Sequence, residues 1–247
     1  MYLSCLLIDV GDNPDHPRPG RLWLRNIYHV HQRLCMAFPS TSRISDDADF
    51  LKPFKPEDFG PQQIHVARGS DAGFLFRIDP QPGGRVVILV QSAVKPDWDY
   101  AFRNAAYLLA AGPETKAIEP VLTRGQRMRF RLRANPTVRR VFGGPAPEGE
   151  PVPSGKRIGV YKEEAQRKWL DAKAEKAGFR LLDCRVLDRG FLVSRKPGSK
   201  EPVRHLCVDF EGVLEVTDPD RFRPALRAGL GSGKAFGFGL LSVARGE

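Results

Sequence analysis

The second half of the chain opens with Gln126-Arg127-Met128-Arg129-Phe130-Arg131-Leu132-Arg133-Ala134. Successive side chains of a β-strand point to opposite faces, so this alternation predicts a strand with one apolar face and one basic face. The basic face carries Arg127, Arg129, Arg131 and Arg133. Like charges on one face repel, and an anion lying across them would relieve the repulsion. The other interpretation is a solvated face whose arginines are partly paired with Asp or Glu.

The segments after this strand complete a βαββαβ unit. Gly178 ends the first predicted helix, and Asp218-Pro219 opens the second. The predicted elements are a strand at 126–134, a helix at 161–177, strands at 179–187 and 204–216, a helix at 218–228 and a strand at 238–244. This is the ferredoxin-like order.

The first half of the chain repeats that order. The turn Gln81-Pro82-Gly83-Gly84 predicts a hairpin between two of its strands. The predicted elements are a strand at 2–10, a helix at 24–38, strands at 74–78 and 85–91, a weak helix at 97–111 and a strand at 115–121. We therefore predict an α+β protein of two tandem ferredoxin-like (RRM-like) domains, at residues 1–121 and 122–247. Residues 11–20 and 41–69 are predicted as long loops, and the Gly/Pro-rich residues 141–156 as a mobile one.

Charge narrows the range of partners. The 247 residues include 39 Lys and Arg against 29 Asp and Glu, a net charge of +10, which favours a nucleic acid or another polyanion. The four cysteines lie far apart, without a C-x-x-C pair, and no His/Asp/Glu cluster has metal-ligand spacing. We predict no metal and no cofactor. No apolar run approaches the roughly 18 residues of a membrane span, so we expect a cytoplasmic protein without a membrane partner.

Five glycines and Lys234 crowd residues 229–241, written GLGSGKAFGFGLL. One explanation is a loop whose backbone amides meet a polyanion, with Gly231 and Gly233 giving access and Lys234 supplying charge. The other is a glycine-rich turn before the last strand. Two nucleotide motifs are excluded, because Ala228 stands where a P-loop needs its first glycine and no G-x-G-x-x-G spacing fits.

Tyr28 and His31 are three residues apart, so on a helix they are neighbours. By helical angle they flank the edge of the apolar stripe. Such a pair could present polar atoms to a cleft, and histidine is well suited to proton transfer near neutral pH. From the helix alone, a partly buried histidine with a structural hydrogen bond is the commoner explanation.

Taken together, these segments resemble the CasE family, the CRISPR RNA-processing endoribonucleases of type I-E systems. That family is part of the RAMP superfamily and of the Cascade complex. The resemblance is carried, in order along the chain, by Met1-Tyr2-Leu3-Ser4, Tyr28-His29-Val30-His31-Gln32, Phe38-Pro39, Phe130-Arg131-Leu132-Arg133-Ala134-Asn135-Pro136, Gly155-Lys156-Arg157, Phe210-Glu211-Gly212-Val213-Leu214 and residues 229–241.

The resemblance implies a metal-independent enzyme that binds the stem-loop of a CRISPR repeat and cuts at the 3′ base of the stem. The RNA's own 2′-hydroxyl would attack, leaving a 2′,3′-cyclic phosphate, with His31 and Tyr28 as the catalytic residues. The RNA would lie on Arg127, Arg129, Arg131, Arg133, Lys156, Arg157, Gly231, Gly233 and Lys234. The chain would be a monomer when free and a partner of other Cascade subunits. No further basic catalytic residue is assigned, because the positions near Met36 lack a lysine pattern.

Three alternatives stay open. A non-catalytic RAMP subunit would share the fold and charge but would not require Tyr28 and His31. A general RNA-binding domain would show aromatic stacking residues on its strands, and no such run is present. A metabolic enzyme with a phosphate-binding loop is disfavoured by the failed nucleotide motifs and by the charge.

Overall fold

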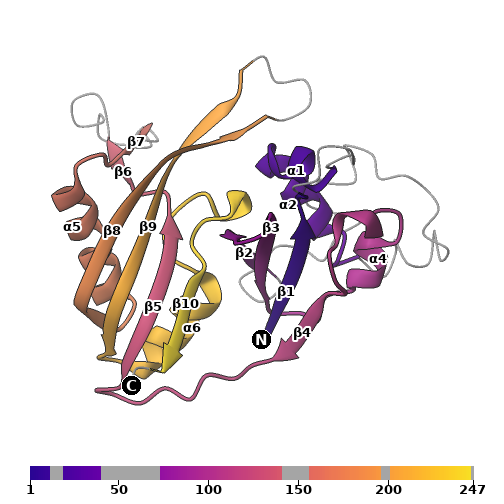
Figure 1. Cartoon of the computed structure of the whole chain (residues 1–247). Helices are drawn as coiled ribbons and strands as arrows, with labels where there is room; N and C mark the ends of the chain where they lie inside the picture. Colours follow the sequence, from indigo (N-terminus) through magenta and orange to yellow (C-terminus); the bar gives the residue numbers. More distant parts are fainter. Residues whose placement is uncertain (12–18, 40–72, 141–155, 196–200, 246–247) are drawn as a thin grey trace, which may run out of the picture.

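The computed structural model describes residues 1–11, 19–39, 73–140, 156–195 and 201–245 (Figure 1). These residues form two four-stranded antiparallel sheets, each with its own hydrophobic core, and a two-stranded ribbon. The predicted loop at 41–69, the predicted mobile loop at 141–156 except for its last residue, and residues 12–18 of the predicted loop at 11–20 lie outside the described residues. In the described part of the chain, no helix is both long and apolar enough to cross a membrane.

The first sheet has the order β2-β3-β1-β4, with its longer strands packed against α2. Leu6 and Ile88 from the sheet and Val30 and Leu34 from α2 are fully buried in its core. The elements are β1 (Tyr2–Asp9), α1 (Pro19–Leu24), α2 (Ile27–Cys35), β2 (Phe74–Gln81), β3 (Arg85–Ser92), α4 (Trp98–Phe102), the 3₁₀ turn η2 (Ala106–Leu108) and β4 (Glu114–Ala117).

The second sheet repeats this arrangement with the order β10-β5-β9-β8. Its elements are β5 (Arg127–Ala134), α5 (Glu163–Lys176), β8 (Phe179–Ser194), β9 (Val203–Val216), α6 (Pro219–Ala228), the 3₁₀ turn η3 (Lys234–Phe236) and β10 (Leu241–Arg245). A two-stranded ribbon, β6 (Thr137–Arg140) and β7 (Lys156–Gly159), branches off between β5 and α5. Both sheets have the ferredoxin-like strand order, which confirms the predicted α+β class and the tandem domains.

The alternation in β5 has the predicted effect. Met128, Phe130 and Leu132 are buried in the second core, where Trp169 of α5 stacks on Phe210 of β9 at 6.1 Å between ring centroids. The arginines lie on the opposite face of the strand. The domain boundary stays a proposal: we place it at residue 121, in the segment that joins β4 to β5.

Two predicted helices differ in detail from the structure. The helix expected at 24–38 is the shorter helix α2, because Asn26 is extended (φ −116°, ψ 101°) and separates α2 from α1. The segment 97–111 forms α4 and η2 rather than one helix. No strand was predicted at β6 or β7, since four-residue strands give little periodic signal.

Strands β8 and β9 extend well past the second sheet. The pairing of β5 with β9 stops at Ala134 opposite Val208, whereas β8 and β9 continue to the pair Ser194–Val203. We call residues 191–195 and 203–206, beyond the irregularity between Asp188 and Phe191, the arm. Figure 1 shows the two strands leaning across toward α1 and α2 of the first domain. The prediction ended the first of these strands at residue 187, so it missed the arm.

Candidate functional site

Helix α2 begins at a side-chain cap. Asn26 Oδ1 accepts a hydrogen bond from the backbone N–H of Tyr28 at 3.2 Å, which satisfies one of the free amides at the helix start. Tyr28 is half-buried in the first turn, and His31 follows one turn later. The cap therefore fixes where the helix carrying both predicted catalytic residues begins.

The ring of His31 is covered by the first sheet. It stacks on Phe74 at 5.5 Å and on Phe76 at 6.3 Å between ring centroids, and the residue is 7% exposed. Its Nε2 lies 3.5 Å from Cys35 Sγ, one turn further along the helix. The ring is therefore buried, because the two phenylalanines of β2 extend the core over it.

The glycine-rich segment, residues 229–241, joins the two domains. Phe236 packs against the core of the first domain. A Cβ at Gly237 would lie 3.3 Å from Phe76 and 3.7 Å from Ile27, so the segment runs close against β2 and α2. Gly237 also has a left-handed backbone (φ 80°), which glycine adopts without strain.

The other end of the same segment lines what we call the basic pocket, a cavity of 270 Å³. Its lining consists of Thr137, Arg139, Arg157, Trp169, Lys173, Gly231 and Ser232. Arg139 and Arg157 are direct cross-strand partners in β6 and β7, an arrangement of like charges that destabilises a ribbon unless an anion lies between them. Among the described residues, none of the ion pairs involves Arg139, Arg157 or Lys173.

Lys234 lies close to this cluster of cations. Burial, and then the positive charge of Lys173, hold the pKa of Lys234 below its usual value. Both effects oppose the charged ammonium, and both would be offset by a phosphate placed between the two lysines. The basic pocket therefore has the electrostatics of an anion site.

The arginine face of β5 is divided in two. Arg127 and Arg129 are exposed, whereas Arg133 is largely buried and binds Asp209 through two hydrogen bonds, of 2.7 and 2.9 Å. Arg131 reaches Asp79 of the first domain at 3.5 Å and Asp209 of the second at 3.7 Å. Both arginines thus belong to an ion-pair network between the domains.

Asp209 lies at the centre of that network and is fully buried. Arg189 of β8 also contacts it, at 3.1 Å. Burial alone would raise the pKa of Asp209, but the hydrogen bonds and charge of Arg133, followed by Arg189 and Arg131, hold that pKa below its usual value. The carboxylate therefore stays charged inside the protein.

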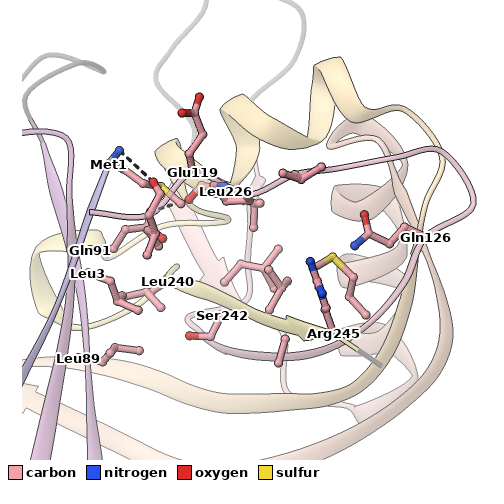
Figure 2. A pocket seen from close by; sticks show the side chains of 17 residues that line it. Met1, Leu3, Leu89, Gln91, Glu119, Gln126, Leu226, Leu240, Ser242 and Arg245 are labelled. Atoms are coloured by element: carbon pink, nitrogen blue, oxygen red, sulfur yellow. Dashed lines mark hydrogen bonds between the residues drawn. The ribbon is translucent and has the colours of Figure 1, made fainter. Parts of the chain in front are cut away.

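A separate cavity of 350 Å³ lies between the sheets and contains none of the predicted site residues. Figure 2 shows Leu3 and Leu89 of the first sheet on one side of it and Leu240 and Ser242 on the other. Gln91 donates a 2.7 Å hydrogen bond to the Leu226 carbonyl, which connects the two domains beside this cavity. The lining is mostly apolar and offers no acid–base pair.

The sequence profile of a family described as "CRISPR associated protein" matches residues 1–245. The chain is 38% identical to the CRISPR-associated endoribonuclease Cse3 of Thermus thermophilus over 204 residues, which are 74% of this chain and 90% of that protein. It is 27% identical to the Cascade subunit CasE of Escherichia coli, over 99% of both chains.

The fold agrees with these sequence matches. The structure of Thermus thermophilus Cse3 bound to an RNA representing a pre-cleavage complex superposes with a TM-score of 0.68. That match has 31% identity and covers 98% of each chain.

The chain belongs to the CasE/Cse3 family of CRISPR-associated proteins.

In this CasE/Cse3 family member, the predicted site residues fall into three groups. Tyr28 and His31 lie on α2 at the domain junction. Arg157 and Gly231 meet in the basic pocket, with Gly233 and Lys234 next along the glycine-rich segment. The backbone of Lys156 belongs to strand β7, and the structure does not describe its side chain.

The four arginines of β5 do not act as one surface. Arg131 and Arg133 have the carboxylate partners that the second interpretation of the strand required, and only Arg127 and Arg129 remain exposed. Gly231 also has a packing role, since a Cβ there would lie 3.0 Å from Trp169. The glycine-rich turn and the anion-binding loop are therefore compatible explanations of the same segment.

Three residues near the candidate site were not predicted from the sequence. Lys173 faces the basic pocket from α5, four residues after Trp169, a spacing equally typical of any solvated helix face. Asn26 precedes an apolar run, which is a readable helix-start signal. Asp209 is one of three acids in β9, and nothing local links it to Arg133.

Within the described residues, no group of three or more His, Cys, Asp or Glu side chains is arranged to hold a metal ion. The four cysteines are free thiols, and Cys35 and Cys207 are buried.

Proposed function

We propose that this chain is a cytoplasmic, metal-independent endoribonuclease that processes CRISPR precursor RNA. It binds the stem-loop of the repeat, cuts at the 3′ base of the stem and stays with the product as part of Cascade. The Thermus thermophilus and Escherichia coli relatives, named an endoribonuclease and a Cascade subunit, support this assignment.

The glycine-rich segment is the observation that carries the proposal. One end of it lines the basic pocket with Gly231 and Ser232, and the other packs on α2 through Phe236 and Gly237. A phosphate-binding surface and a helix with an acid–base pair are thereby joined by a single short loop.

The reaction needs only groups that the RNA and α2 supply. The 2′-hydroxyl of the nucleotide before the cut loses its proton and attacks the adjacent phosphorus, and the P–O5′ bond breaks. A 2′,3′-cyclic phosphate forms, and the leaving 5′-oxygen takes up a proton. His31 transfers a proton at one of these oxygens, and Tyr28 assists and orients.

The basic pocket and the exposed arginines bind the RNA backbone. Arg139, Arg157 and Lys173 hold phosphates of the stem, and Arg127 and Arg129 provide further contacts outside the pocket. A-form RNA is recognised mainly by shape and phosphates, which suits a cluster of cations better than a set of base-reading side chains.

His31 has to become reachable for this chemistry. Its ring is covered by Phe74 and Phe76 in the RNA-free chain. We infer that RNA binding shifts the His31 ring, so that one ring nitrogen faces the scissile phosphate. Hydrogen bonds of catalytic residues often tighten only in the substrate complex.

The test is single-turnover cleavage of a labelled repeat stem-loop in excess EDTA. Wild type should cut once, and a 2′-deoxy substitution at the scissile nucleotide should abolish the cut. His31→Ala should lower the rate by about 10²–10⁴-fold. His29→Ala, an exposed histidine on the same helix, is the matched control and should cut normally.

Two outcomes would contradict the proposal. Tight binding without cleavage by wild type would favour the non-catalytic RAMP subunit. Cleavage that EDTA abolishes and a divalent cation restores would mean that the mechanism requires a metal.

A further inference from the structure

The carboxamide of Asn26 makes contacts in both domains. Besides capping Tyr28, its Oδ1 accepts from the backbone N–H of Arg195 at 3.2 Å, and its Nδ2 donates to the Arg195 carbonyl at 2.9 Å. Arg195 is 169 residues away along the chain and directly follows β8 at the end of the arm. The side chain therefore pairs with the arm as a neighbouring strand would.

The arm needs such contacts, because it is a two-stranded ribbon beyond the edge of its sheet. Isolated two-stranded hairpins are marginally stable in water. Its second attachment is His205, whose ring stacks on Phe236 of the glycine-rich segment at 4.4 Å and whose Nε2 lies 3.1 Å from Ser194 Oγ. The arm thus contacts both the start of α2 and the glycine-rich segment.

We propose that Asn26 is a positioning residue for the cleavage reaction, tying the start of α2, and with it Tyr28 and His31, to the arm of the second domain. This rests on the proposed function. This contact holds RNA that is bound to the second domain in a fixed position relative to Tyr28 and His31 of the first domain. Asn26 touches no reacting atom and acts through the backbone that carries Tyr28.

The chemistry of the carboxamide makes the proposal specific. The cap and the Arg195 N–H need an acceptor, whereas the Arg195 carbonyl needs a donor. The asparagine amide supplies them from two separate atoms, Oδ1 and Nδ2. Aspartate can cap the helix equally well but turns a carboxylate oxygen toward the Arg195 carbonyl. Asn26→Asp therefore separates the tie to the arm from the cap.

The experiment compares wild type, Asn26→Asp and Asn26→Ala at saturating repeat RNA. We expect Asn26→Asp to keep the wild-type melting temperature and to lower the single-turnover rate roughly ten- to a hundredfold. Hydrogen exchange in residues 191–195 and 203–206 should speed up in both variants. Asn26→Ala should in addition lower the melting temperature, because it removes the cap.

Asn104→Asp is the matched control for the added negative charge. Asn104 is exposed in the same domain, and its Oδ1 accepts from the Arg33 guanidinium, a bond that aspartate keeps. Asn104→Asp should therefore cleave at the wild-type rate, and a loss equal to that of Asn26→Asp would assign the effect to charge.

Failure of this proposal is distinguishable from failure of the proposed function. A wild type that binds but never cuts contradicts the function itself. A wild type that cuts, together with an Asn26→Asp variant that cuts equally fast, contradicts only the positioning role. A loss that resides entirely in RNA affinity also contradicts it.

Discussion

Arg133 and Asp209 face each other directly across β5 and β9, with Nε 2.7 Å from Oδ1. The arginine also donates to the Ile78 carbonyl of the first domain at 2.5 Å. The pair is therefore both a cross-strand contact within one sheet and part of the contact between domains.

Removing the Asp209 carboxylate should be costly. Asp209→Asn leaves Arg133 and its neighbours without their buried counter-charge, and breaking such a pair costs about 3–5 kcal/mol. Glu211→Gln removes a more exposed partner of Arg131 and should cost at most about 1 kcal/mol. Urea unfolding of both variants measures the difference, and equal effects would mean that the network contributes little.

Acid should weaken the protein through the same carboxylate. The pKa of Asp209 is lower in the folded chain than in the unfolded one, where it is about 3.9. Its contribution is therefore complete above that value and is lost as the pH falls through the folded pKa. The free energy of unfolding should fall less steeply below pH ~4 in Asp209→Asn than in wild type. Parallel pH curves would contradict this.

His205 should add a second pH dependence nearer neutrality. Burial holds the pKa of His205 below its ordinary value, so the folded chain favours the neutral ring. Its contribution is complete above the unfolded value of about 6.5 and is lost as the pH falls through the lowered folded pKa. Between pH 7.5 and 5.5, His205→Gln should lose less unfolding free energy than wild type. An equal loss of unfolding free energy in the two proteins would mean that another group titrates in this pH range.

The basic pocket should appear in the salt dependence of RNA binding. Each phosphate contact releases counterions, so Lys173→Ala should reduce the slope of log affinity against log salt by about 1. Lys95→Ala, which removes an exposed lysine of the first domain, should leave the slope unchanged. Filter binding from 50 to 300 mM salt would distinguish the two. Equal slopes for wild type and Lys173→Ala would mean that Lys173 contacts no phosphate of the RNA.

Gly229 and Gly83 form a matched pair for the glycine-rich segment. Both have a positive φ, at which alanine is strained. The strain is greater at Gly229, because its ψ of 165° lies in a region that is open almost only to glycine. A Cβ at Gly229 would lie 2.6 Å from the Gly239 carbonyl oxygen, whereas one at Gly83 meets nothing within 4 Å. Gly229→Ala should be less stable than Gly83→Ala by about 1–3 kcal/mol in thermal or urea unfolding. Equal losses would mean that the segment can move aside.

The elements of the fold were largely predictable because local patterns carry them. The alternation of β5 and the Gln81–Gly84 turn each specify a strand or a hairpin within a few residues. The arm was not predictable, since its length is set by contacts with Asn26 and Phe236 in distant parts of the chain.

The site was predictable in its residue types more than in its geometry. Tyr28 and His31 stand out as a pair at helical spacing. That His31 is buried depends on Phe74 and Phe76, which reach it only after β2 has paired in the sheet. Likewise, the division of the β5 arginines depends on Asp79 and Asp209, which no local pattern connects to them.

The shared carboxylate of Asp209 has a consequence for how this protein can diverge. Three arginines from two strands, Arg131, Arg133 and Arg189, form ion pairs with this carboxylate. Loss of the acid therefore leaves several buried or half-buried cations without a counter-charge. A lineage changing one residue at a time would have to pass through that unpaired intermediate. Positions 131, 133, 189 and 209 are therefore expected to be replaced together among relatives or to persist together, whereas Arg127 and Arg129, which lie outside the network, can drift independently.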